Sequence, residues 1–154
     1  MELKVREIKS KDIYLRDALK LVKNVFDEFE APYYSEEGVI TFYKFIDYDN
    51  INKMLDDNLE MYALLEFGRV VGVIAFRDKS HITLLFVDKK YHKQGVGSRL
   101  LYIMREKCLR SVYTVNSSPY AVEFYEKRGF EKVSEEQLKD GIRFTPMKQE
   151  IKLL

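Results

Sequence analysis

The chain has 154 residues, 46% of them hydrophobic, and its 26 lysines and arginines nearly balance its 25 aspartates and glutamates. This length suits a single domain, residues 1–154, which buries enough apolar surface to need no disulfide or metal. A formal net charge of +1 argues against a nucleic-acid partner, and no apolar run approaches the roughly twenty residues of a membrane span.

The first predicted elements are a strand and a long helix. Residues 3–8 alternate apolar and polar side chains, as a half-buried strand does. Ser10 or Asp12 can cap the following helix, and Pro32 is expected to end it. The helix repeats apolar residues on one face at Leu15, Ala18, Leu19, Val22, Phe26 and Phe29.

Two shorter helices and a hairpin are predicted next. Apolar spacing indicates a helix over residues 39–46, and Asp49 or Asn50 can cap another helix. Residues 61–66 and 70–76 are apolar runs separated by a short turn that contains a glycine. This pattern is typical of an antiparallel hairpin.

The next stretch is the one most suggestive of a ligand. Residues 82–87 predict a strand, residues 88–94 form a charged elbow, and Gly95 and Gly97 lead into a helix. The apolar face of that helix comprises Leu100, Leu101, Met104 and Cys108, the last a core residue rather than a nucleophile. Unpaired N–H groups and the helix dipole attract anions at such a terminus, and glycines allow close approach. We therefore expect a phosphate-bearing ligand.

Three kinds of phosphate loop can be compared with these glycines. A P-loop requires Lys followed by Ser or Thr after its last glycine, but Ser98 and Arg99 follow Gly97. A dinucleotide fingerprint requires glycines directly after the strand and a small residue where Leu100 stands. Both fail, so a third kind of phosphate loop and a glycine turn without a ligand stay open.

The C-terminal third predicts strand, helix and two further strands. Residues 112–115 form a strand, which the preceding strand–helix connection makes parallel to residues 82–87. Ser118 caps the last helix, with Pro119 at its first position, and Gly129 ends it. Strands are expected over the two ranges 130–133 and 142–147.

Two motifs carry a family resemblance. Residues 92–97, His-Lys-Gln-Gly-Val-Gly, resemble the coenzyme A loop of GNAT N-acetyltransferases, with His92 where that family usually has Arg or Gln. Residues 115–130 are similar to the second GNAT motif, with Asn116, Tyr125 and the final Gly-Phe in order. The ending 140–147 is also common there. On these motifs the chain is identified as a member of the GNAT superfamily.

The resemblance implies an α/β (α+β) fold. It is a mixed, mostly antiparallel sheet of about seven strands, with helices on both faces and a splayed central parallel pair. Acetyl-CoA is the implied co-substrate, with no metal. Its pantetheine would pair with the exposed strand and its diphosphate would bind the loop. The cofactor-binding residues would be Leu85, Phe86, Val87, His92, Lys93, Gln94, Gly95, Val96, Gly97, Ser98, Asn116 and Tyr125.

The resemblance also implies direct acetyl transfer to an amine in a ternary complex. Tyr125 matches the family's general acid, and a phenol with a pKa of about 10 can protonate a thiolate with a thiol pKa near 8.5. The alternative is that Tyr125 is only a core aromatic residue. Asn116 has two interpretations of equal weight, a ligand of pantetheine and an ordinary turn residue.

The general base and the acceptor are not identified by the sequence. His81 and His92 are poorly placed to act as the base. Four acids could border the predicted acceptor site: Glu28, Glu30, Glu36 and Glu37. A chain of water molecules is the alternative to a side-chain base. Tyr33, Tyr34 and Phe42 suggest an aromatic acceptor site. The acceptor is a small-molecule amine or an amine of a peptide or protein.

Several expectations remain alongside this interpretation. The lone cysteine and an N-terminus without an apolar leader favour a cytoplasmic protein, and a homodimer stays open. A catalytically silent acyl-CoA-binding regulatory or interaction module is the alternative function. A nucleotide-binding domain is a weaker alternative, because the glycine spacing disfavours it.

Overall fold

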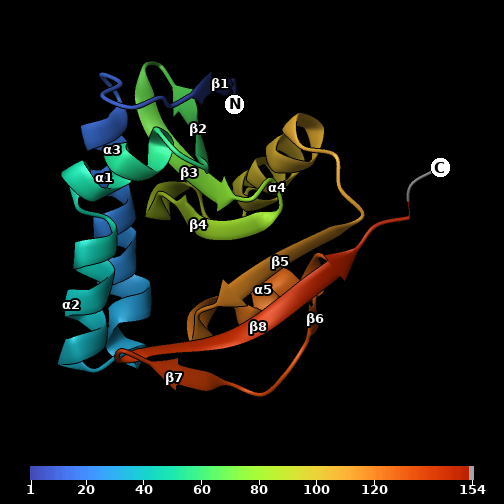
Figure 1. Ribbon diagram of the computed structural model, residues 1–154. Helices are drawn as coiled ribbons and strands as arrows, with labels where there is room; N and C mark the ends of the chain where they lie inside the picture. The colour runs from blue at the N-terminus through green and yellow to red at the C-terminus, as the bar shows by residue number, and fades with distance from the viewer. Residues whose placement is uncertain (153–154) are drawn as a thin grey trace.

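The computed structural model describes residues 1–152 and contains one large mixed sheet (Figure 1). Its strand order is β1-β2-β3-β4-β5-β8-β6, and β7 pairs with β8 beside this path. The strands are β1 (Lys4–Glu7), β2 (Leu59–Glu66), β3 (Arg69–Arg77), β4 (His81–Val87), β5 (Val112–Ser117), β6 (Glu131–Lys132), β7 (Gln137–Lys139) and β8 (Ile142–Glu150). All pairs are antiparallel except β4 with β5, so the predicted sheet type is confirmed.

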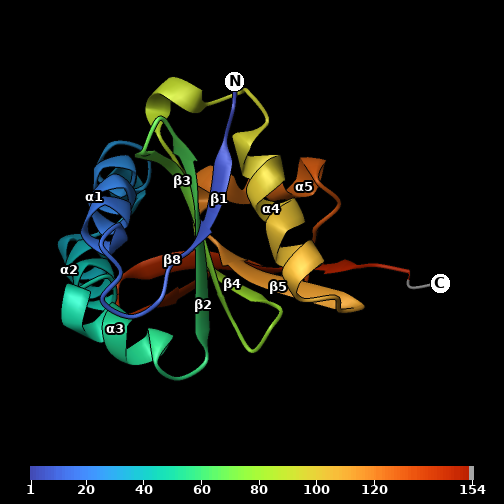
Figure 2. The ribbon, with the colours of Figure 1, turned by 90° about the horizontal axis from the view of Figure 1, so that it is seen from above.

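Helices cover both faces of the sheet, as predicted. Figure 2 shows α1 (Leu15–Val25), α2 (Glu36–Phe45) and α3 (Tyr48–Leu55) on one side, and α4 (Val96–Lys107) and α5 (Val122–Lys127) on the other. One core lies under each layer. α1 packs its predicted stripe on β3 and β4, and α4 packs Leu100, Leu101 and Met104 on the opposite face.

The predicted helix boundaries need three corrections. α1 begins at Leu15, because Asp12 accepts a hydrogen bond from the Tyr14 N–H at 2.8 Å and holds a turn ahead of the helix. Pro32 does not end the helix; it lies in a short 3-10 turn that follows a π-helical turn. Asp47 caps α3, since its carboxylate accepts from the N–H groups of residues 49 and 50, the two caps we had predicted.

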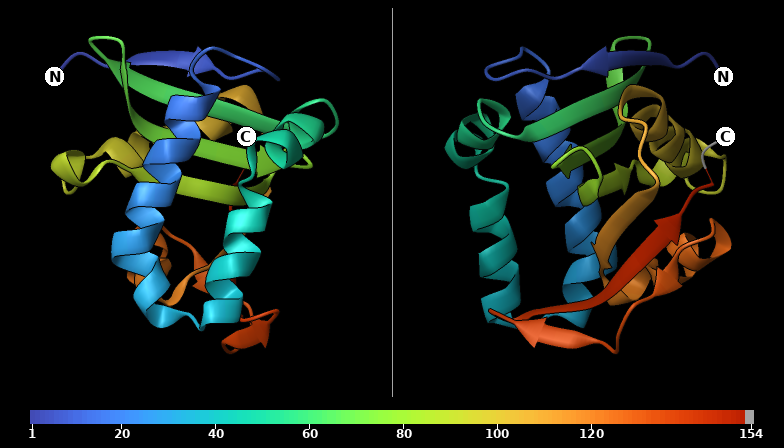
Figure 3. Two further views of the ribbon diagram at one scale, coloured as in Figure 1. Left: turned by 90° about the vertical axis from the view of Figure 1, so that its left-hand side faces the viewer. Right: turned by 45° about the vertical axis from the view of Figure 1, so that its right-hand side comes forward.

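The sheet has one strand more than predicted. β7 was missed because all three of its residues are exposed, so it has no alternation of buried and exposed side chains. Its turn into β8 lies against α2, where the backbones of Gly38 and Gly141 approach so closely that a Cβ on either would overlap the other residue. Figure 3 shows this turn beside the N-terminal end of α2. The contact joins the C-terminal hairpin to the N-terminal helices.

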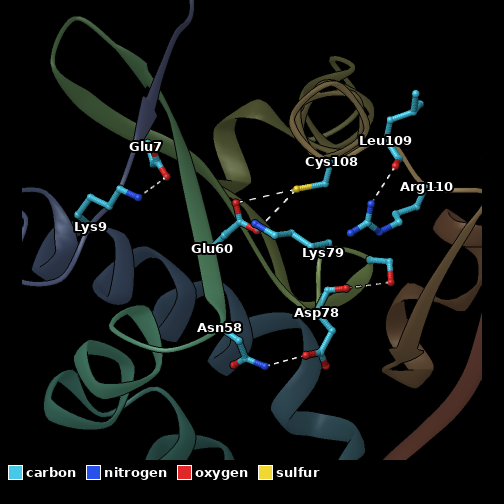
Figure 4. Close-up of polar contacts among 10 residues, drawn as sticks. Glu7, Lys9, Asn58, Glu60, Asp78, Lys79, Cys108, Leu109 and Arg110 are labelled. Atoms are coloured by element: carbon cyan, nitrogen blue, oxygen red, sulfur yellow. Dashed lines mark hydrogen bonds and ion pairs between the residues drawn. The ribbon is translucent and has the colours of Figure 1, made fainter.

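Cys108 is a core residue, as predicted. It is 6% exposed, and its Sγ lies 3.6 Å from a carboxylate oxygen of Glu60, which also pairs with Lys79 at 3.0 Å (Figure 4). Burial, with the nearby Glu60 charge, raises the pKa of the Cys108 thiol. The thiol is therefore protonated and a poor nucleophile. Among the described helices, none is long and apolar enough to cross a membrane.

Candidate functional site

The candidate site begins where the two parallel strands separate. β4 and β5 pair only at His81 with Thr114 and at Ile82 with Val115. Farther along β4, the edge facing β5 has no strand partner, while the opposite edge still pairs with β3 up to Val87. The predicted splay is therefore present, and alternate residues within 83–87 direct backbone N–H and C=O groups toward the gap.

A cavity of about 510 Å³ lies on the α4 side of the splay. Of the twelve predicted cofactor residues, Leu85, Phe86, Val87, His92, Lys93, Gly95, Val96 and Gly97 line it. Gly95 caps α4 with φ +81°, a left-handed conformation that glycine adopts without strain, so α4 begins at Val96, between the two glycines. No side chain caps this terminus. The first-turn N–H groups are consequently available to an anion.

Positive charge collects around this first cavity. Lys93, Lys127 and Arg128 line it; the acids Glu30 and Glu123 line it too, and Glu123 pairs with Lys127 at 3.0 Å. Arg128 donates from Nε to Ser98 Oγ at 2.8 Å, which fixes its guanidinium beside the start of α4, and it stacks 3.7 Å from the Phe124 ring centre. The site therefore combines side-chain cations with a helix N-terminus, two features that favour phosphate.

Several predicted loop side chains bind the loop itself. His92 donates from Nε2 to the Val87 carbonyl at 2.7 Å, and Gln94 donates from Nε2 to the Lys90 carbonyl at 2.9 Å. These bonds fix the elbow between β4 and α4. Gln94 and Ser98 lie outside the cavity lining, and Ser98 acts through Arg128.

A second cavity of about 280 Å³ lies on the other side of the splay, under α2. Tyr125 and Asn116 line it together with Thr83 and Ser117. Its aromatic wall contains Tyr34, Phe42 and Phe45, and Phe42 stacks on Phe26 with ring centres 3.9 Å apart. Of the predicted aromatic residues, Tyr33 is exposed and does not line this cavity.

Glu30 lies where the two cavities meet, since it lines both. α1 continues into a π-helical turn, Phe26–Glu30, closed by the Ala31 N–H bonding to the Phe26 carbonyl. Burial raises the pKa of Glu30 to about 7, and a hydrogen bond from Ser118 opposes that rise. A carboxyl group with a pKa near neutrality can exchange protons with a ligand at physiological pH.

Sequence reasoning named Glu30 only as one acid among four. The other three are placed differently: Glu28 pairs with Lys89 at 2.9 Å, and Glu36 and Glu37 are exposed at the start of α2. The only sequence signal for Glu30 was its position just before Pro32 in an aromatic-rich segment. A π-turn cannot be read from an apolar stripe with ordinary helical spacing, so the signal was weak.

Tyr125 reaches the same junction from α5. Its side chain is 4% exposed, and its ring packs edge-on against Phe124 and Phe130. No hydrogen bond joins its hydroxyl to another of the described residues. Burial, reinforced by the nearby Glu30 charge, raises the pKa of Tyr125 far above its ordinary value. The phenol therefore stays protonated and can act only as a hydrogen-bond or proton donor.

The remaining histidine is at the opposite end of the splay. His81 Nδ1 lies 2.7 Å from Thr114 Oγ1, where β4 and β5 still pair. Burial lowers the pKa of His81. Its position agrees with the sequence interpretation that it is poorly placed to serve as a base.

Known proteins resemble this chain in sequence and in fold. A family model described as an acetyltransferase (GNAT) domain matches residues 30–151. The S-(2-succino)cysteine N-acetyltransferase of Bacillus subtilis is 27% identical over 124 residues, which cover 69% of this chain and 74% of the relative.

Two solved structures have the same fold. A GCN5-related N-acetyltransferase from Rhodopseudomonas palustris superimposes with a TM-score of 0.83, at 20% identity, covering 98% of this chain and 97% of the other. The PaiA N-acetyltransferase of Thermoplasma acidophilum, solved in complex with coenzyme A, gives 0.76 at 16% identity, covering 98% and 100%. At these identities the similarity is one of fold.

Proposed function

Because the chain belongs to the GNAT acetyltransferase family, we propose that it transfers an acetyl group from acetyl-CoA directly to a primary amine in a ternary complex. The observation that carries this proposal is the position of Glu30, which lines both cavities, with Tyr125 in the lining of the smaller cavity and close enough for the Glu30 charge to raise its pKa. One cavity is cationic and bounded by a helix N-terminus, and the other is small and largely aromatic. Such a junction allows a donor and an acceptor to meet from opposite sides.

Acetyl-CoA is assigned to the cationic cavity. The diphosphate binds the N–H groups at the start of α4, with Lys93 and Arg128 supplying charge. The amides of pantetheine pair with the edge of β4 along residues 85–87, as a neighbouring strand would, except at the Val87 carbonyl, which already accepts from His92. Similarity to a fold solved with coenzyme A supports this assignment.

Glu30 is assigned as the general base. Its carboxylate takes a proton from the acceptor ammonium, and the freed nitrogen lone pair attacks the thioester carbonyl carbon. The new carbon–nitrogen bond gives a tetrahedral intermediate, whose oxyanion is stabilised by a backbone N–H of β4. The carbon–sulfur bond breaks as this intermediate collapses, and the nitrogen loses its second proton, which balances the proton gained by the sulfur. The products are an amide and coenzyme A, with one net proton released to solvent after Glu30 is deprotonated again.

Tyr125 is assigned to the leaving sulfur. A phenol whose pKa is raised far above 10 is a weak acid toward a thiolate, since each unit of mismatch costs about 1.4 kcal/mol. Hydrogen-bond donation from the hydroxyl to the developing thiolate avoids that full cost. The sulfur then receives its proton either from the Tyr125 hydroxyl, as negative charge develops on the sulfur, or from water after coenzyme A is released.

A ligand screen followed by a turnover assay tests the proposal. Saturation with acetyl-CoA at a hundredfold excess over its dissociation constant should stabilise the fold by about 2.7 kcal/mol, with no comparable effect of ATP or NAD. Thiol release in the presence of an amine panel should then exceed the amine-free rate. Binding of acetyl-CoA without amine-dependent thiol release would favour the silent acyl-CoA-binding module instead.

A further inference from the structure

The two cavities differ in the cations that line them. The donor-side cavity is lined by Lys93, Lys127 and Arg128, and also by the acids Glu30 and Glu123, of which Glu123 pairs with Lys127 at 3.0 Å. The smaller cavity, which we call the acceptor cavity, has no lysine, arginine or histidine among its described lining residues. Its single carboxylic acid is Glu30. A carboxylate or phosphate on the acceptor would therefore be desolvated beside a negative group and without a cationic partner, which is strongly unfavourable.

Three hydroxyl groups of the acceptor cavity already donate their hydrogens to backbone carbonyls, whereas the Tyr125 hydroxyl, which also lines it, donates to none of the described residues. Thr41 Oγ1 donates to the Asp140 carbonyl at 2.8 Å, and Thr83 Oγ1 donates to the Ala75 carbonyl at 3.1 Å. Ser117 Oγ donates to the Ser118 carbonyl at 2.9 Å. Each oxygen can then only accept a hydrogen bond from a ligand. A wall of acceptors suits an N–H donor and disfavours an anion.

Neutral donors remain in the acceptor cavity. The Asn116 amide and the Tyr34 hydroxyl both line it, and either can serve a neutral oxygen on the ligand. Neither group can carry a positive charge, and burial keeps Tyr34 neutral by raising its pKa. Arg143 follows the lining residue Ile142, and its charge acts on Tyr34, but its guanidinium is bound to Glu136 at 3.0 Å and to the Tyr33 carbonyl at 3.1 Å.

The remaining lining is apolar and the space is small. Phe42, Phe45 and Ile142 provide a largely aromatic surface, and Phe42 also lies 5.9 Å from the Phe86 ring centre. A volume of about 280 Å³ lies just below the usual range for small-molecule sites, roughly 300–1,000 Å³. The space suits a compact apolar body, and aromatic faces also attract an ammonium group.

We propose that the acceptor is a small primary amine with a compact apolar or aromatic body and no carboxylate or phosphate group. This inference rests on the proposed function, because it names the substrate class of the same site. It separates this chain from the Bacillus subtilis relative, which is named for acetylating S-(2-succino)cysteine. The two chains would share the donor side and differ in the acceptor.

Matched pairs of ligands test the inference by binding. Calorimetry on the coenzyme A complex would compare 2-phenylethylamine with phenylalanine, and butylamine with norvaline, since each pair differs by one carboxylate. We expect each amine to bind at least tenfold more tightly than its amino acid. Equal or tighter binding of either amino acid or of S-(2-succino)cysteine, or no binding of either amine, overturns the inference.

Thiol release measured with the same ligands decides the proposed function separately. If the amines bind selectively but no thiol is released, acetyl transfer is rejected and the proposed ligand class stands. If acetyl groups are transferred to the amino acids, acetyl transfer stands and the proposed ligand class is rejected. Arg143→Gln provides a further check. It should leave amine binding unchanged; if amino acids bind to the wild type and lose affinity in R143Q, Arg143 turns into the cavity and the inference is wrong.

Discussion

Gly97 and Phe124 are in direct contact across the two helices on one face of the sheet. A Cβ built on Gly97 would lie 2.6 Å from Cε1 of the Phe124 ring, closer than real carbon atoms approach. The sequence suggests that Gly97 is small so that a ligand can come near. In the structure, Gly97 is first of all small because α4 and α5 pack there.

Gly97→Ala should therefore destabilise the protein even without a ligand. Overpacking of one methyl group against a ring held by its neighbours typically costs about 1–3 kcal/mol. Urea unfolding of the ligand-free protein measures the loss. Combining the change with Phe124→Leu should recover part of it, and a Gly97→Ala protein as stable as wild type would mean that Phe124 moves aside freely.

Tyr125→Phe should slow turnover without disturbing the fold. The ring still fills its place between Phe124 and Phe130, so stability and acetyl-CoA binding should hardly change. If the hydroxyl assists the leaving sulfur, kcat should fall roughly 10²-fold, while KM for acetyl-CoA stays nearly constant. Tyr102→Phe is the control, because Tyr102 is 61% exposed on α4. Wild-type kcat in both variants would leave Tyr125 a packing residue.

The pH dependence of the reaction should report Glu30. Because its pKa is raised to about 7, the folded protein holds the protonated, inactive carboxyl below that pH. With an acceptor of much higher pKa, kcat/KM should rise about tenfold per pH unit below 7 and level off above it. Glu30→Gln should abolish this inflection and lower the rate roughly 10²-fold. An unchanged inflection in Glu30→Gln would assign it to another group.

The stability of the fold should fall as pH rises, whereas the rate should rise, and Glu30 is the expected cause of both. Unfolding returns the carboxyl to its ordinary pKa of 4.5 from about 7, so the fold loses stability as pH rises between these values. The penalty approaches roughly 3.5 kcal/mol above pH 7, at about 1.4 kcal/mol per pKa unit. Glu30→Gln should therefore raise the melting temperature at pH 8 and leave it unchanged near pH 4. Glu28→Gln, a change at a half-exposed side chain, should show no such pattern.

Lys93→Ala should weaken acetyl-CoA binding mildly. Lys93 lines the donor cavity but is exposed. The substitution therefore removes one solvent-screened charge and leaves the backbone N–H donors in place. A loss of about two- to fivefold in affinity is expected at low salt, shrinking at 1 M salt. Lys139→Ala, which lies outside both cavities on β7, should have no effect. A loss that ignores salt would indicate a role for Lys93 in shaping the loop.

The parts of the fold set by periodic burial could be predicted from the sequence. The stripes of α1 and α4 and the central strands carry most of the core, and their patterns were plain. β7 was missed because nothing in it is buried. The start of α1 was misplaced because Asp12 caps an isolated turn two residues ahead of Tyr14, which resembles a helix cap in sequence.

In the candidate site, the residues that belong to continuous sequence motifs could be predicted, whereas those brought in from distant segments could not. The Gly95 loop and Tyr125 belong to continuous motifs, so both could be named and both lie along the splay. Glu30 and Phe45 reach it from segments far away in the sequence. Their approach depends on how α1 and α2 cross the sheet, and no local spacing records that crossing.

The π-helical turn at Phe26–Glu30 also affects how relatives should be compared. Such a turn holds one residue more than an α-helical turn, and each residue adds a rotation of about 100° about the axis. A relative that is one residue shorter here would leave a gap in an alignment and could supply its carboxylate from a neighbouring column. Homologous bases in this group should therefore be matched by their position in the cavity rather than by alignment column.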